Sequence, residues 1–180
     1  MLTIGPLMIE HRLIEKGIEV LRQEAERIAQ GGEVDPLIID ILVDFIRTYA
    51  DRTHHGKEED ILFLDLAQKD LSAEDRRVMQ ELVDEHAFAR KTVAELVEAK
   101  ERCLSGDKRA ISRAVEKMAS LARFYPDHIK KEDKVFFPAS LKYFSREEQD
   151  AMLEEMREFD RRMIHEKYKA VIQRLESRER

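Results

Sequence analysis

One short pattern occurs twice in this chain: a histidine followed four residues later by a glutamate. The stretch "THHGKEEDILFL" (53–64) aligns with "DHIKKEDKVFFP" (127–138), and an earlier stretch, "IEHRLI", aligns with "DEHAFA" at nearly the same offset. A repeat of this length is typical of two related structural units. We therefore expect two helical hairpins, each with one histidine and one His-x-x-x-Glu motif. The alignment places three pairs of residues in register: His11 with His86, His54 with His128, and Glu58 with Glu132.

The spacing of apolar residues indicates helices throughout the chain. Apolar residues recur at intervals of three and four, and only four prolines and six glycines interrupt 180 residues. We predict an all-α fold with one domain over residues 1–180. It consists of an up-down-up-down four-helix bundle over 1–140 and an additional C-terminal helix over 145–178.

Proline, glycine and capping residues predict where these helices begin and end. The expected limits are Pro6 to Gly31-Gly32, Asp35-Pro36 to Leu66, Ser72 to Ser105-Gly106, and Asp107 to Pro138. A capping box, Ser145 to Glu148, opens the last helix, whose apolar side includes Met152, Met156, Met163 and Val171.

Charge and hydropathy exclude two classes of partner. Charged residues make up 39% of the chain, but the formal net charge is only −6 and the two signs interleave, so no basic surface for nucleic acid is expected. The longest apolar runs are far shorter than a membrane span, and the first residues, "MLTIGPLMIEH", lack the features of a signal peptide. We expect a cytoplasmic protein that contacts neither nucleic acid nor membrane.

Helical periodicity places the repeated histidines on inward, apolar sides of their helices. His54 shares its side with Ala50 and Ile61, and His128 shares its side with Leu121 and Val135. The rival pair with the same spacing is His55 with Glu59. This pair shares its side of the helix with polar residues, which places it nearer the solvent: Asp44, Thr48, Asp51 and Arg52. The lysines beside the repeated glutamates are also expected in solvent: Lys57, Lys130 and Lys131.

Two glutamates inside an apolar bundle need a partner. A bare buried carboxylate costs several kcal/mol, and no lysine or arginine is predicted on the inward sides. A metal cation resolves this conflict, since it accepts carboxylate oxygens and neutral imidazole nitrogens together. Four histidines and two glutamates exceed the needs of one tetrahedral zinc. We predict two metal ions bridged by the glutamates, with iron favoured over manganese or zinc.

The full pattern resembles the hemerythrin-like HHE cation-binding family. The resemblance covers residues 1 to about 140, and the later stretch "HEKYKAVIQRLE" is similar to the closing helix of bacterial members. It implies a hemerythrin-like four-helix bundle with a bridged di-iron centre that binds dioxygen or another diatomic ligand. By position, the implied metal ligands are His11, His54, Glu58, His86, His128 and Glu132.

Two positions depart from the oxygen-carrying hemerythrins. Those proteins have a second histidine one turn after the one in the third helix, where this chain has Arg90, and their last carboxylate lies five residues past its histidine, whereas Glu132 lies four past His128. One metal then lacks an imidazole. We predict that His55 supplies it, the alternative being that His55 is a rim residue; Glu59 is expected outside the site, so that its replacement by alanine has no effect.

Three classes of function remain open at this point. The first is a non-haem di-iron protein that senses, carries or scavenges dioxygen or nitric oxide, or handles iron. The second is an enzyme, either a di-iron oxidase or peroxidase or an iron-sulfur repair protein, and the third is a bundle in which the metal is structural. The expected partner is a small diatomic ligand, with the chain a monomer or a homodimer formed through the C-terminal helix.

Overall fold

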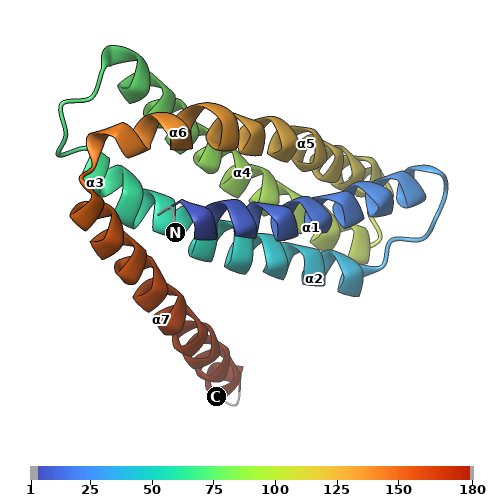
Figure 1. Cartoon of the computed structure of the whole chain (residues 1–180). Coiled ribbons are helices and arrows are strands. Elements are labelled where there is room, and N and C mark those ends of the chain that lie inside the picture. The colour runs from blue at the N-terminus through green and yellow to red at the C-terminus, as the bar shows by residue number, and fades with distance from the viewer. Residues whose placement is uncertain (1–3, 179–180) are drawn as a thin grey trace.

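The computed structural model describes the backbone of residues 4–178 and the side chains of residues 4–169. Four long helical segments run alternately up and down, and a fifth leaves the end of the bundle (Figure 1). This confirms the predicted all-α fold, and residues 4–178 contain no strand. None of the helices in this part of the chain combines the length and the apolar character needed to cross a membrane.

The second and fourth segments change their helical geometry along their length. The first and third segments are the uninterrupted helices α1 (Gly5–Ala29) and α4 (Ala73–Leu104). The second runs through α2 (Pro36–Phe45), the π-helical η1 (Ile46–His55) and η2 (Glu58–Phe63), and α3 (Leu64–Leu66). The fourth runs through α5 (Arg109–Lys131), the π-helical η3 (Glu132–Phe136), α6 (Phe137–Ser140) and the 3-10 turn η4 (Leu141–Tyr143).

Local chemistry sets the helix ends close to the predicted limits. Asp35 accepts a hydrogen bond from the backbone N–H of Leu37 at 2.9 Å, and Ser72 caps α4 in the same way through Asp75 at 3.1 Å. The fourth segment continues past its predicted end at Pro138, which stands in the first turn of α6 directly after the π-helical η3.

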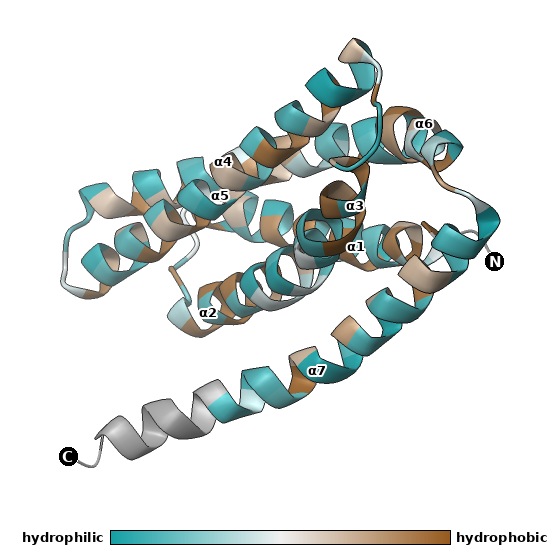
Figure 2. Cartoon of the chain, turned by 90° about the vertical axis from the view of Figure 1, so that its left-hand side faces the viewer, coloured by the Kyte–Doolittle hydropathy of each residue, from teal (hydrophilic) through white to brown (hydrophobic). Residues whose placement is uncertain are grey.

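Apolar side chains form two clusters, one in each half of the bundle's length. The first lies toward the α1–α2 and α4–α5 loops and includes Ile18, Leu96 and Met118. The second lies toward the opposite end and includes Leu62 and Phe137. In Figure 2 the apolar residues lie mostly between helices, with polar residues on their outer sides. The repeated histidines and glutamates are buried where the two clusters meet.

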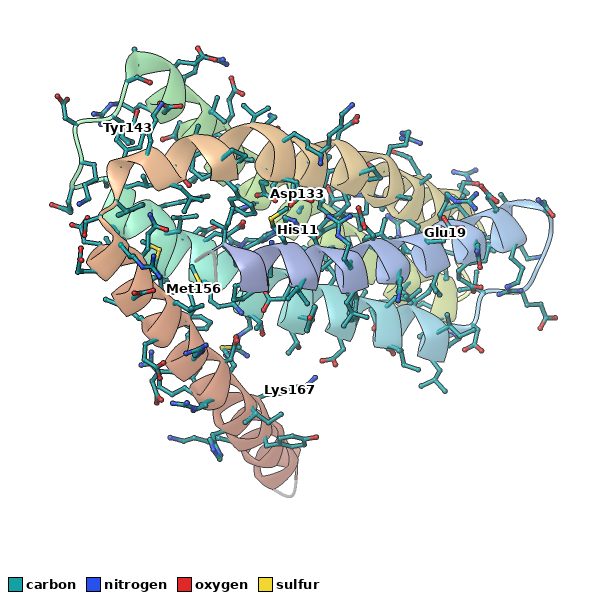
Figure 3. All side chains as sticks on the ribbon, in the orientation of Figure 1. His11, Glu19, Asp133, Tyr143, Met156 and Lys167 are labelled. Carbon is teal, nitrogen blue, oxygen red and sulfur yellow. The ribbon has the colours of Figure 1, made fainter. Side chains whose placement is uncertain are left out.

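The fifth segment is α7 (Arg146–Arg178), which passes obliquely beside η1 and η2. It opens with the predicted capping box, in which Ser145 N–H donates to Glu148 at 2.8 Å and Glu148 N–H donates to Ser145 at 3.2 Å. Its methionines Met152, Met156 and Met163 are buried against the bundle, and Met156 is labelled in Figure 3. The side chain of Val171, predicted on the same apolar side, lies outside the described residues.

Candidate metal centre

Two buried groups of metal-binding atoms lie side by side in the middle of the bundle. One consists of three histidines, and the other of two histidines and both repeated glutamates; within each group the donor atoms lie within 4.8 Å of one another. We call them the three-histidine cluster and the two-histidine cluster. Their members are His55, His86 and His128 in the first, and His11, His54, Glu58 and Glu132 in the second.

The two glutamates each face both clusters. One oxygen of Glu58 lies 3.6 Å from His54 Nε2, and its other oxygen lies 3.4 Å from His86 Nε2. One oxygen of Glu132 lies 3.1 Å from His11 Nε2, and the other lies 3.2 Å from His128 Nε2. Each carboxylate therefore spans the space between the clusters, which is the placement that a bridging ligand requires.

Each of the five histidines directs Nε2 inward and holds Nδ1 on a carboxylate. Such carboxylates fix the tautomer and the orientation of a metal-binding imidazole. Figure 3 shows one of the pairs, His11 of α1 with Asp133 of η3. The five Nδ1 contacts are His11 to Asp133 at 2.7 Å, His54 to Glu10 at 2.9 Å, His55 to Asp51 at 3.4 Å, His86 to Glu59 at 2.7 Å, and His128 to Glu85 at 2.8 Å.

Four cations lie behind these carboxylates and form a third layer, outside the metal-binding atoms and the carboxylates that contact Nδ1. Arg90 donates to both Asp51 and Glu59, at 2.7 and 2.8 Å. The other three carboxylates each accept from one cation: Asp133 from Arg12, Glu10 from Lys57, and Glu85 from Lys131. Every imidazole thus contacts a carboxylate that a cation holds in place.

The inward atoms have no such partners. Nε2 of all five histidines and both oxygens of Glu58 and Glu132 lack a hydrogen-bond partner among the described residues. Nine buried polar atoms without partners would cost about 1–3 kcal/mol each if nothing bound them. Cations bind this mixture of imidazole nitrogen and carboxylate oxygen, so the residues present fit a metal centre.

Burial and charge shift the pKa values of these groups. Burial, and then the nearby carboxylates led by Glu132, raise the pKa of Glu58 well above its ordinary value. Burial also acts to raise the pKa of Glu132, but the facing imidazoles, chiefly His128 and His11, overcome it and hold that pKa well below the ordinary value. Burial lowers the pKa of His54 to about 4 and that of His55 well below its ordinary value. Both imidazoles stay neutral at pH 7, as metal ligands must be.

Three positions differ from what helical periodicity predicts. His55 is 1% exposed, although periodicity placed it near the solvent, because the hydrogen bonds of η1 span five residues and side chains there depart from the 3.6-residue period. Val135 is 52% exposed, although it was placed in the core; its counterpart Ile61, also in a π-helical turn, is 3% exposed because α7 packs beside η2. The third difference is Lys57, which is 0% exposed because α7 covers it, while Lys130 is exposed as predicted.

Glu59 belongs to neither cluster, but the prediction that it is a solvated residue is wrong. Its carboxylate, half-buried, accepts from Arg90 and contacts His86 Nδ1. The guanidinium of Arg90 donates to Asp51 and Glu59. His55 lies with His86 in the three-histidine cluster, where it can supply the imidazole that Arg90 does not.

Sequence reasoning missed the residues that hold Nδ1, although the repeat contains a signal for most of them. Glu10 and Glu85 each precede a repeated histidine, and Glu59 and Asp133 each follow a repeated glutamate. The repeat thus extends to four carboxylates that share one task. Asp51 is the exception, since Tyr125 occupies the equivalent position, and no repeated pattern could have pointed to it.

A comparison with known protein families identifies the family of this chain. The family described as "Hemerythrin HHE cation binding domain" matches residues 3–140 and, in a second, overlapping match, residues 80–178. The chain belongs to this family of cation-binding helical bundles. No curated protein matches its sequence. Family membership implies that the chain binds cations, and the two clusters are groups of residues that could hold them.

Proposed function

We propose that this protein is a non-haem di-iron protein that binds dioxygen or nitric oxide, and that it senses, carries or scavenges this ligand. One ion would be held by His55, His86 and His128, the other by His11 and His54, with Glu58 and Glu132 bridging the two. Nitrogen and oxygen donors at five or six positions suit iron, with manganese or zinc as substitutes.

The observation that carries this proposal is the unequal number of imidazoles. In the repeat, His86 corresponds to His11 and His128 to His54, but His55 corresponds to Ile129. Ile129 is buried in the core at the place where the symmetry of the two halves would put a sixth imidazole. One ion would therefore have three nitrogens and the other only two, which leaves a position open for a ligand on the side of Ile129.

The surroundings favour a small ligand. The imidazoles are 0–2% exposed, and aromatic rings stack on three of them: Phe137 on His11 at 5.7 Å, Phe63 on His86 at 6.0 Å, and Phe124 on His128 at 5.0 Å. An organic substrate would have to separate these rings to reach the centre, whereas a diatomic molecule needs only small fluctuations of the core. This argues for ligand binding over the oxidation of a larger substrate.

The chain's own contribution is to fix donors and exclude water. When bound, a pair of iron ions would supply reversible binding of a diatomic ligand. The Nδ1 carboxylates keep each proton on Nδ1 and each Nε2 free to donate its electron pair.

Replacing Ile129 tests this function directly. Ile129→His should supply the missing imidazole, so that the protein still holds two iron ions but no longer changes its visible spectrum when reduced protein meets nitric oxide. Ile129→Leu, a conservative control, should keep the response. The proposal would be contradicted if the visible spectrum of reduced wild type changed with neither dioxygen nor nitric oxide. It would also be contradicted if Ile129→His responded as wild type does.

A further inference from the structure

Lys57 is the one cation of the third layer that is completely buried. Its side chain is 0% exposed, whereas the side chains of Arg12, Arg90 and Lys131 are 53%, 41% and 30% exposed. A buried ammonium is costly unless it is paired with carboxylates. Lys57 has two, and they come from helices at opposite ends of the sequence: Glu10 of α1 and Asp160 of α7.

These contacts connect the C-terminal helix to the metal centre. The Asp160 carboxylate lies 2.6 Å from Lys57 Nζ, and Lys57 Nζ donates to one oxygen of Glu10. The other oxygen of Glu10 lies 2.9 Å from His54 Nδ1, and His54 Nε2 is a donor atom of the two-histidine cluster. A row of four contacting side chains therefore connects the surface of α7 to a metal-binding nitrogen: Asp160, Lys57, Glu10 and His54.

The other half of the molecule has the same residues without this connection. In the repeat, Glu10, His54 and Lys57 correspond to Glu85, His128 and Lys131. Lys131 pairs with Glu85 and, at 3.5 Å, with Glu81, both from α4, and it remains partly exposed. The difference between the two lysines is the presence of α7 over Lys57.

Gly56 explains why α7 can lie over one half and not the other. Gly56 has an ordinary helical φ of −59°, so its conformation does not require glycine. A Cβ atom there would lie 2.8 Å from Phe159 Cζ of α7, which is closer than carbon atoms approach without displacement. The equivalent residue of the other half is Lys130, which is exposed. The missing side chain thus allows Phe159 to dock and brings the next residue, Asp160, to Lys57.

We propose that Lys57 and Asp160 are positioning residues of the metal centre, through which α7 holds His54 in place and slows loss of the ion at the two-histidine cluster. This inference rests on the proposed binding of two iron ions. Outer carboxylates of metal ligands change metal affinity by about 10–100-fold when they are removed. Lys57 fixes such a carboxylate, and Asp160 fixes Lys57, so the effect should decrease along the chain. By linkage, a bound ion should also stabilise the docking of α7.

Release of iron to a bidentate ferrous chelator under anaerobic conditions tests the inference, with four full-length proteins compared. Lys57→Met should release the more labile of its two ions roughly 10-fold faster than wild type, and Asp160→Asn about 3-fold faster. Lys131→Met, the matched control from the other half, should leave that phase within twofold of wild type. Asp160 is 44% exposed, so Asp160→Asn decides the question even if Lys57→Met does not fold.

Hydrogen exchange supplies a readout that a purely structural role would not affect. Backbone amides of residues 156–163 should exchange about 3-fold more slowly in iron-loaded than in iron-free wild type, and this dependence on iron should disappear in Asp160→Asn. Wild-type release rates in both Lys57→Met and Asp160→Asn, equal acceleration of the same phase in Lys131→Met, or exchange that ignores iron would overturn the inference. A wild-type protein that retains no iron would instead overturn the proposed function itself.

Discussion

The two hairpin halves of this molecule share a pattern but not an environment. Both place a histidine, a His-x-x-x-Glu motif and two supporting carboxylates at equivalent positions. The first half adds His55 and Gly56, and α7 covers it. The second half has Ile129 and Lys130 at these positions and is open to solvent nearby: Val135 is 52% exposed, while its counterpart Ile61 is 3% exposed. The shared residues form the metal-binding frame, and the differences give the two clusters different numbers of imidazoles.

Removing the metal should produce the largest change, because the proposed ions join the two halves. An ion present at about 1,000 times its Kd stabilises the folded state by about 4 kcal/mol. For a chain of this size that corresponds to a fall in Tm of roughly 10 °C after metal removal. Thermal unfolding followed by circular dichroism, with metal content verified, measures the difference. Identical Tm values with and without metal would mean that Glu58 and Glu132 have another partner.

Acid should destabilise the metal-free protein through the covered half. His54 has a pKa of about 4 in the folded state, below the ordinary value of 6.5, because burial disfavours the charged ring. The unfolded chain binds this proton first, so the contribution is complete above pH 6.5 and is lost as the pH falls toward 4. It amounts to about 3 kcal/mol. Urea unfolding of metal-free wild type and His54→Gln between pH 7 and pH 4 should show this extra loss in wild type alone; parallel curves would contradict it.

Variants of the carboxylates that contact Nδ1 should affect the two proposed ions one at a time. Glu59→Ala should weaken the ion at the three-histidine cluster by about 10-fold, since Glu59 contacts His86, and Asp133→Ala should weaken the other ion similarly through His11. The exposed neighbour Asp60 offers a control, and Asp60→Ala should match wild type. Competition titrations with a chelator provide the affinities. If Glu59→Ala behaves like Asp60→Ala, the carboxylate does not orient His86.

The smallest predicted change concerns the contact that allows α7 to cover only one half. Gly56→Ala should displace Phe159, and overpacking of this kind costs about 1–3 kcal/mol, partly offset by about 1 kcal/mol from the better helix propensity of alanine. Amide exchange in residues 156–163 should therefore become a few-fold faster. Lys130→Ala, at the equivalent place in the other half, should leave it unchanged. Equal exchange in both variants would show that α7 does not depend on the missing side chain.

The sequence predicted what depends on regular periodicity and on repetition. The helices, their caps and the burial of His11, His54, His86 and His128 follow from a 3.6-residue period and from the alignment of the halves. The burial of His55 did not follow from that period, because the π-helical turns of η1 change it locally; only the imidazole missing at Arg90 pointed to His55. The burial of Lys57 did not either, because it depends on α7, whose docking involves residues about 100 positions away in the chain.

The central claim is that one chain holds two unlike iron ions, one with three imidazoles and one with two. Mössbauer spectroscopy of protein loaded with ⁵⁷Fe, together with metal analysis, tests this most directly. The account predicts two ions per chain and two quadrupole doublets of equal area in the reduced protein, with His55→Ala altering only one of them. A single ion per chain, or one doublet for two equivalent ions that His55→Ala leaves unchanged, would contradict it.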